Sequence, residues 1–223
     1  MPILLLAPAL AIVLTVVLYP IYYGIDISLH KTRFLEKGAF VGLSTYGSLF
    51  RESEFILAIR TSLMYAVGSL VLTSVIGMAL ALLLNRPIRF RPVFRTILII
   101  PWTLSQAVTA SLWLWLLNPT YGPLKYLLSQ VGAHEVVLLS NPHWALPIVI
   151  LVNTWMSYPF PMILYLAALQ TVPEEVIEAA RIDGCSTWAS FWRVTLPSIR
   201  ATILSTSILL TLQFLNMVTL IYV

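Results

Sequence analysis

The sequence predicts an all-α integral membrane protein, a polytopic helix bundle that forms one transmembrane domain over residues 1–223. Of its 223 residues, 59% are hydrophobic and only 10% are charged, whereas about a quarter of the residues in soluble domains are charged. The mean hydropathy is +0.90. The charged residues are confined to segments between long uncharged stretches. A soluble protein of this length would need a charged surface that this chain lacks.

Five apolar stretches can each supply the roughly 20 residues that cross a bilayer as a helix. We predict spans at about residues 3–25, 61–85, 96–117, 144–169 and 201–223. The first stretch has no basic residues before it and is longer than the apolar part of a typical signal peptide, so we expect a transmembrane helix there. A long polar loop, from Asp26 to Arg60, connects the first two spans.

The loop at residues 86–95 carries four arginines and no acid, which indicates a cytoplasmic loop under the positive-inside rule. Over the whole chain the rule is not decisive. With the loops at 86–95 and 170–200 inside, seven Lys and Arg residues lie inside and six outside. The basic residues are spread over loops rather than gathered on a soluble domain, so we expect no binding of nucleic acid.

Small residues and prolines in the spans predict how the helices pack. Gly77 and Ala81 are four residues apart, a spacing that suits close contact between membrane helices. Pro101, Pro147 and the Pro159/Pro161 pair lie in or near spans, where proline kinks a helix. Such kinks are either hinges that line a pathway or ordinary features of membrane helices.

Residues 170–200 predict a helix–turn–helix between the fourth and fifth spans. Thr171 and Glu174 match a capping box, and Gly184 suits the left-handed residue that ends a helix. Ser186 can cap a second helix, which we expect to end at Leu196-Pro197. A helix lying on an anionic membrane should be rich in Lys and Arg, but the first helix is mainly acidic. These residues alone favour a docking helix and a solvated loop about equally.

The same loop closely resembles the EAA loop of ABC-type importer permeases. The resemblance rests on Glu178-Ala179-Ala180, then Gly184, then Val194-Thr195-Leu196-Pro197 after nine further residues. Weaker patterns typical of the carbohydrate-uptake branch (maltose, multiple-sugar and glycerol-phosphate-like permeases) occur in order along the chain, such as Ile100-Pro101-Trp102. Cys185 and Ala201 depart from the usual Ala and Pro.

The resemblance implies the type I importer permease fold, with about six helices and a sixth expected beyond Val223. It also implies several partners: a second homologous permease, two ATPase subunits and an extracytoplasmic solute-binding protein. ATP and Mg²⁺ would be bound by the ATPase, so we expect no cofactor, no metal and no catalytic site in this chain. The implied location is the cytoplasmic (inner) membrane of a bacterium or archaeon, crossed several times.

Two sets of residues are candidates for function. The resemblance assigns coupling to the ATPase to a set within residues 174–197: Glu178, Ala179, Ala180, Asp183, Gly184, Phe191, Leu196 and Pro197. A second set consists of polar or aromatic residues within the spans, which we expect to line the solute pathway: Gln106, Asn153, Trp155, Tyr158, Gln213 and Asn216. Amides and hydroxyls beside aromatic rings suit a sugar, but amides also join membrane helices, and both interpretations remain open.

The expected function is translocation in a binding-protein-dependent importer, for a sugar, driven by ATP hydrolysis on a separate subunit through the 174–197 loop. The alternative is an ion-coupled secondary carrier of a small polar solute. No Asp, Glu, Lys or Arg falls in the middle of a span, whereas ion-coupled carriers usually need such groups. An intramembrane enzyme is disfavoured because all three histidines lie in loops and neither G-x-S-x-G nor H-E-x-x-H occurs.

Overall fold

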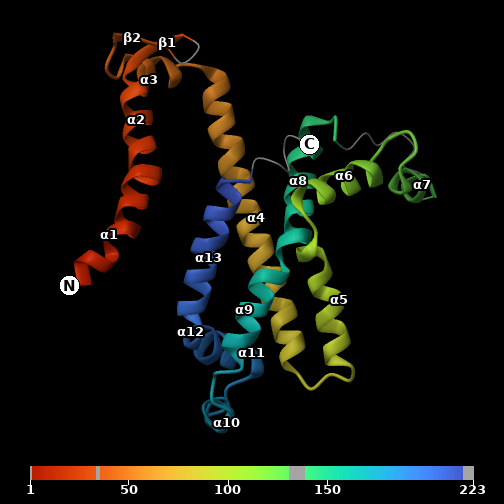
Figure 1. Cartoon of the computed structure of the whole chain (residues 1–223). Helices are drawn as coiled ribbons and strands as arrows, with labels where there is room; N and C mark the ends of the chain where they lie inside the picture. The colour runs from red at the N-terminus through yellow and green to blue at the C-terminus, as the bar shows by residue number, and fades with distance from the viewer. Residues whose placement is uncertain (1, 34–35, 131–138, 218–223) are drawn as a thin grey trace. The chain divides into compact units, whose positions relative to one another are not determined.

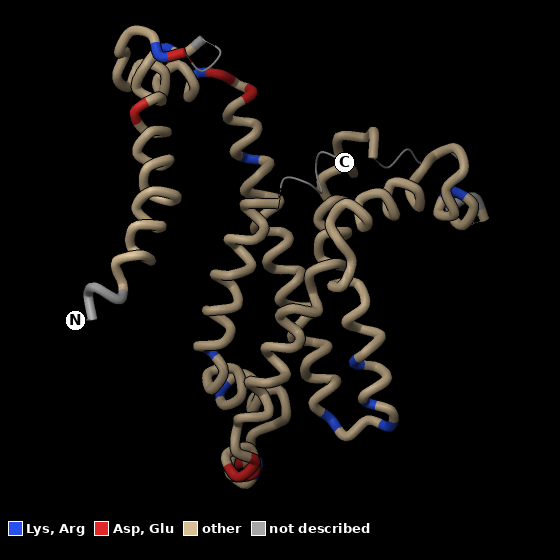
Figure 2. The backbone as a smooth tube through the Cα atoms, in the orientation of Figure 1, with Lys and Arg blue, Asp and Glu red and all other residues tan. Residues whose placement is uncertain are grey.

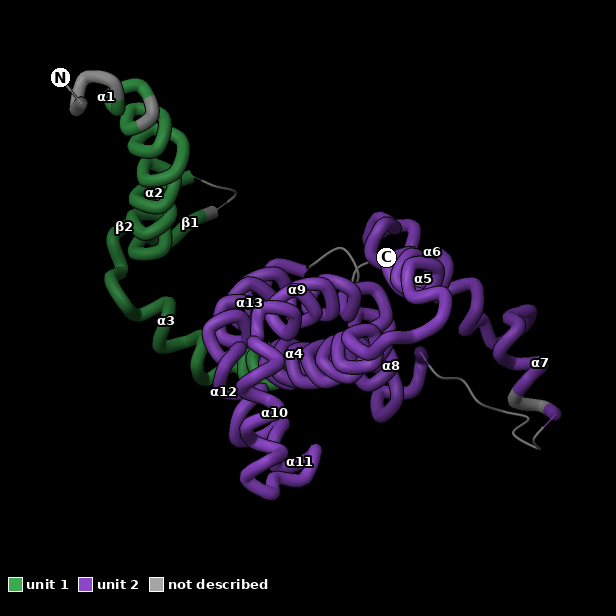
Figure 3. Tube along the Cα trace, turned by 90° about the horizontal axis from the view of Figure 1, so that it is seen from below, with its two compact units in different colours: residues 1–60 green, residues 61–223 purple. Residues whose placement is uncertain are grey.

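The computed structural model describes residues 2–33, 36–130 and 139–217. The chain divides into two compact units, residues 1–60 and residues 61–223 (Figure 3). The first unit begins with α1 (Pro2–Ile12), the π-helical η1 (Val13–Leu18) and α2 (Tyr19–Ser28). Leu6–Ser28 within this run is long and apolar enough to cross a membrane. Its side chains from Leu10 to Ile25 are exposed in this unit, as those of a lipid-facing helix would be.

The polar segment after α2 is folded, a feature that the sequence analysis did not predict. It contains the antiparallel strands β1 (His30–Arg33) and β2 (Glu36–Phe40), in a register that pairs His30 with Phe40, followed by α3 (Ser44–Leu49). Lys37 forms an ion pair with Asp26, and the Tyr46 hydroxyl donates to Ser28 Oγ at 2.7 Å. The strands carry no apolar alternation, the usual sequence signal for a strand.

α4 (Ser53–Asn85) is a 33-residue helix that starts eight residues before the predicted second span. The predicted third span, 96–117, is instead a broken pair, α5 (Arg91–Thr103) and α6 (Gln106–Leu116), bent by 95°. Leu104 adopts an extended conformation, and Ser105 caps the new helix by accepting from the Val108 N–H. The break therefore results from a capping serine two residues after the end of α5, a helix that Pro101 already weakens.

The remaining helices are α7 (Pro123–Gln130), α8 (Pro142–Ser157), α9 (Pro159–Leu169), α10 (Glu174–Ile182), α11 (Thr187–Ser190), the π-helical η2 (Phe191–Thr195), α12 (Leu196–Ser198) and α13 (Arg200–Leu215). α8 and α9 together match the predicted fourth span but bend by 48° at Tyr158-Pro159. The last predicted span begins as α13, and its final residues, 218–223, lie outside the described residues. Counting each bent pair as one span, the described helices supply up to five spans.

Two hydrophobic clusters hold the second unit together, where α4, α8, α9 and α13 lie side by side (Figure 1). One cluster joins α4, α6, α8 and the end of α13, and the other joins α4, α9 and Ile199, just before α13. The small residues of α4 bring it close to α9. A Cβ atom built at Gly77 would lie 2.9 Å from Pro161 Cγ, and Ala81 is fully buried. The predicted close contact at Gly77 and Ala81 is confirmed.

We predict that Gly77→Val lowers the midpoint of thermal unfolding in detergent. The added side chain would meet Pro161 and the backbone of Met162, and overpacking of this kind costs about 1–3 kcal/mol. Gly24→Val is the control, because nothing lies within 4 Å of a Cβ at Gly24. An unchanged midpoint for Gly77→Val would show that α4 and α9 do not pack as described.

Candidate functional site

The helix–turn–helix at residues 170–200 projects from one end of the second unit, where α10 lies furthest out (Figure 1). α10 starts one residue after its extended N-cap, Pro173. The predicted capping box is wrong: the Thr171 hydroxyl donates to the Ala168 carbonyl at 2.8 Å instead. With Pro173 at the N-cap, Glu174 is the first helical residue rather than the third, so it complements the helix dipole but cannot close a box.

The end of α10 matches the prediction for Gly184. This residue has a φ of +82°, and its N–H donates to the Arg181 carbonyl at 3.0 Å. The Cys185 N–H donates to the Ala180 carbonyl, also at 3.0 Å. This pair of bonds is the Schellman motif, which needs a left-handed residue at Gly184. Nothing lies within 4 Å of a Cβ built there, so backbone conformation rather than space requires glycine.

The turn exposes most of the residues that the sequence assigns to coupling. Glu178, Ala179, Asp183, Gly184 and Pro197 are exposed, Phe191 and Leu196 are half-buried, and Ala180 is buried. Ile182 is not among the predicted coupling residues, yet its side chain is 86% exposed. An apolar side chain this exposed beside carboxylates offers both kinds of contact that a protein partner uses.

The second helix of the loop begins as predicted and ends later than predicted. Ser186 Oγ accepts from the Ala189 N–H at 3.2 Å. The helix then continues through Pro197 and breaks at Ile199, where it meets α13 at 69°. Proline does not end it at Leu196-Pro197 because η2 widens the preceding turn. The Leu196 N–H donates to the Phe191 carbonyl five residues back, and Pro197 falls in the first turn of α12, where no N–H is needed.

The basic turn between α4 and α5 lies at the same end of the second unit as this loop (Figure 2). Phe90 in this turn has a left-handed φ of +65°, and the Arg89 guanidinium lies 5.5 Å from the centre of its ring. Both charged segments therefore face the same side of a membrane that the bundle crosses, as the sequence analysis expected from the arginines.

The structure places the predicted pathway residues on α6, α8 and α13 of the second unit and at the bend between α8 and α9. Asn153 is fully buried in α8 and accepts from Ser157 Oγ at 3.2 Å, while its Nδ2 has no partner among the described residues. Trp155 packs with the first cluster and makes an edge contact with Trp113 at 5.6 Å. Tyr158 packs with the second cluster, at the bend between α8 and α9.

The other three pathway candidates lie at or near helix ends. Gln106 is the first residue of α6 and is half-buried, as is Gln213 in α13. Asn216 is exposed, and its Nδ2 donates to the Leu212 carbonyl at 2.8 Å. The Asn216 amide therefore already donates a hydrogen bond to the backbone of α13. Asn153 is a better candidate than Asn216 for contact with a solute, because its Nδ2 has no such bond among the described residues.

The structure also reveals buried hydroxyls that the sequence analysis did not single out. They come from four helices, and each lacks a hydrogen-bond partner among the described residues: Thr73, Thr109, Thr154 and Thr206. A threonine in a membrane helix usually bonds its own helix backbone, so the sequence alone carries no signal for these positions. With Asn153 they belong to a larger set of unpaired polar groups in the described part of the bundle, which also includes Ser69, Ser74, Trp113 and Tyr165.

We predict that Gly184→Val raises amide hydrogen exchange at Cys185 by roughly tenfold, because the left-handed conformation costs a non-glycine residue about 1–2 kcal/mol. Gly184→Asn is the matched control, since asparagine adopts this conformation more readily. Exchange measured by mass spectrometry in detergent separates the two variants. Equal exchange in Gly184→Val and the unmodified protein would contradict the Schellman geometry.

Comparison with known proteins identifies relatives for nearly the whole chain. Residues 73–223 match the family model for the binding-protein-dependent transport system inner membrane component. The trehalose/maltose transport system permease protein MalF of Thermococcus litoralis is 32% identical over 221 residues, which cover 99% of this chain and 75% of that protein. The xylose/arabinose import permease protein XacH of Haloferax volcanii is 36% identical over 180 residues, which cover 81% of this chain and 57% of that protein.

A solved structure shares the fold. A chain of a bacterial ABC transporter involved in the import of the acidic polysaccharide alginate superposes with a TM-score of 0.81 and 29% identity, over 96% of this chain and 72% of that one. The architecture is thus the all-α, polytopic fold of ABC importer permeases. With the family match over residues 73–223, these similarities show that the chain belongs to the inner membrane components of binding-protein-dependent transport systems.

Proposed function

We propose that this chain is the translocation subunit of a sugar importer and that ATP hydrolysis on separate subunits drives it through residues 174–197. The observation that carries the proposal is the exposed turn, with Glu178, Ala179 and Ile182 projecting from a helix whose end is held by the Schellman motif. Small and acidic residues on a rigid, protruding helix allow close docking of a partner.

The packing of the loop supplies a route for this coupling. α10 packs on α11 and η2. These two segments and α12 form one continuous helix that ends at Ile199. Ile199 is 3% exposed and belongs to the second cluster, with Tyr165, Leu166 and Leu169 of α9. A partner that displaces α10 would therefore move the joint of α9 and α13, because packed side chains transmit displacement.

Most of the relatives whose names state a solute transport a carbohydrate, and the exception transports sn-glycerol-3-phosphate, a polyol phosphate. Their names include trehalose/maltose, xylose/arabinose and sn-glycerol-3-phosphate transport, and the solved neighbour imports alginate. The bundle interior fits a polyhydroxylated solute, since most of its unpaired groups among the described residues are hydroxyls, beside the amide of Asn153 and the indole N–H of Trp113. The sequence carries no charged residue in the middle of a span, which favours this proposal over an ion-coupled carrier.

The proposal includes a complete assembly in the cytoplasmic (inner) membrane of a bacterium or archaeon. The partners would be a second permease, two ATPase subunits that bind ATP and Mg²⁺, and an extracytoplasmic binding protein. One solved relative was captured with a periplasmic protein bound to an alginate pentasaccharide. Within the described residues, no group of three or more His, Cys, Asp or Glu side chains is placed to hold a metal ion. In this proposal the chain itself catalyses no reaction.

A charge reversal tests the coupling. The ATPase activity is measured on the assembled importer with loaded binding protein added. Glu178→Arg should lower this activity at least tenfold, because truncating or reversing a charge at a docked interface typically costs about 2–5 kcal/mol. Membrane insertion should stay normal since Glu178 is exposed. Glu52→Arg makes the same change at an exposed position outside the loop. Normal activity in Glu178→Arg, or equal loss in both variants, would refute the coupling role.

A second pair of variants tests the pathway. Asn153→Leu should reduce uptake at limiting solute roughly fivefold to tenfold, the effect of losing about one hydrogen bond. Asn216→Leu should change uptake much less, because that amide already bonds its own helix. Uptake is measured in proteoliposomes, after equal assembly of both variants is verified. If Asn216→Leu proved the more damaging variant, the assignment of Asn153 would fail.

A further inference from the structure

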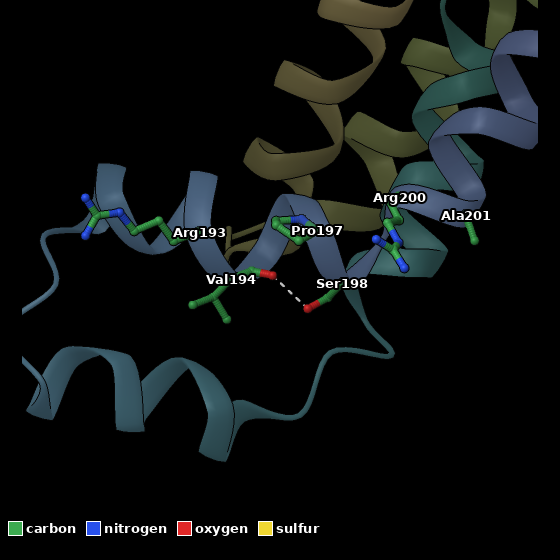
Figure 4. Close-up of a pocket in the computed structure, with 6 residues that line it drawn as sticks. All are labelled: Arg193, Val194, Pro197, Ser198, Arg200 and Ala201. Atoms are coloured by element: carbon green, nitrogen blue, oxygen red, sulfur yellow. Dashed lines mark hydrogen bonds between the residues drawn. The ribbon is translucent and has the colours of Figure 1, made fainter.

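A pocket of about 540 Å³ opens where the loop helix bends into α13. It is lined by Arg193, Val194, Pro197, Ser198, Arg200 and Ala201. The bend of 69° at Ile199 creates it, because α12 and α13 diverge there. Figure 4 shows Arg193 and Arg200 on either side of Val194 and Pro197, with the Arg193 guanidinium extended away from Arg200.

The two arginines of this pocket lack counter-charges within the part of the chain that the structure describes. Both are exposed, no carboxylate among those residues pairs with either, and no acid lines the pocket. The Ser198 hydroxyl donates to the Val194 carbonyl at 2.7 Å. A guanidinium group binds phosphate oxygens in a planar, two-pronged geometry. The pocket therefore offers two anion-binding groups joined by an apolar wall.

The position of the pocket along the helix indicates where the anion would come from. Arg200 is the first residue of α13, and Ala201–Leu215 after it carries no charge. Apolar side chains of α13, among them Leu204 and Ile208, are exposed along this helix. The pocket thus lies where the chain passes from a polar loop into an apolar span, at the level of lipid headgroups.

Two tryptophans of α11 and η2, the helical segments just before the pocket, support a position at the level of the lipid headgroups. Trp188 is 71% exposed and Trp192 is 50% exposed, and their rings meet edge to face at 5.6 Å. Tryptophan is enriched at the membrane–water boundary, where its ring is amphipathic. Of the residues assigned to ATPase coupling, only Pro197 lines the pocket, at its apolar wall.

We propose that this pocket binds an anionic phospholipid of the cytoplasmic leaflet, with Arg193 and Arg200 holding the phosphate groups and Val194, Pro197 and Ala201 contacting the glycerol and the first acyl carbons. The two arginines lie on either side of Val194 and Pro197, which favours a headgroup with two phosphates over one with a single phosphate. Basic pockets beside membrane helices on the cytoplasmic side bind such lipids. The proposal goes beyond transport itself and does not depend on which solute is carried.

Native mass spectrometry of the complete importer, titrated with anionic phospholipid carrying one or two phosphates, tests the proposal. Each arginine near an anionic headgroup contributes a factor of about five in affinity. The double variant Arg193→Gln/Arg200→Gln should therefore bind the lipid about thirtyfold more weakly. Arg86→Gln/Arg89→Gln removes the same charge at the same end of the unit and should bind normally. Ala201→Phe, which fills the pocket without changing charge, should also lose the lipid.

Several results would overturn the proposal. Unchanged lipid binding in the pocket variants would refute the site, and equal loss in the Arg86/Arg89 control would indicate general attraction by charge. A small phosphate adduct in place of a lipid mass would identify a free anion as the ligand. A third contrary result has two parts: the unmodified importer binds no lipid, and the ATPase dissociates from the Arg193→Gln/Arg200→Gln variant. It would show that the two arginines form ion pairs with carboxylates of the ATPase. Sugar uptake, measured separately, keeps these outcomes distinct from failure of the transport function.

Discussion

Burial of Ile199 against α9 is the contact on which the proposed mechanism depends. Ile199 stands at the bend between the loop helix and α13, and it packs in the cluster that contains Leu166 and Leu169. Without this contact the loop would be an appendage, free to move without moving the spans. With it, the loop, the end of α9 and the start of α13 share one close-packed joint. Close-packed interiors transmit displacement because they cannot absorb it.

Proline and glycine give the bundle the bends and close contacts that this joint requires. Pro159 and Pro161 lie at the bend of α8 and α9, and Gly77 lets α4 approach that region closely. The two π-helical turns each precede a proline, at Pro20 and at Pro197, and the helix continues through both. A widened turn frees the backbone from the bond that proline cannot make. The widened turn at η2 lets the loop helix continue past Pro197 and so reach Ile199.

The sequence predicted the membrane class, the four-residue spacing of small residues in α4 and the glycine that ends α10, because each follows from a local rule of hydropathy, packing or backbone conformation. The same rules failed where geometry depends on context. The cap of α10 shifted because Pro173, rather than Thr171, is extended, and the third span broke because Ser105 caps a new helix. The unpaired hydroxyls of Thr73 and Thr206 leave no trace in sequence, since their partners depend on the packing of distant helices.

The central claim is that ATP hydrolysis, acting through the loop, moves a sugar across the membrane. Its most direct test is uptake of a panel of labelled mono-, di- and oligosaccharides into proteoliposomes that contain the complete importer. The account predicts uptake of at least one sugar that requires the binding protein outside and ATP inside, and that persists when ionophores remove every ion gradient. Uptake that is driven by an ion gradient without ATP would contradict it.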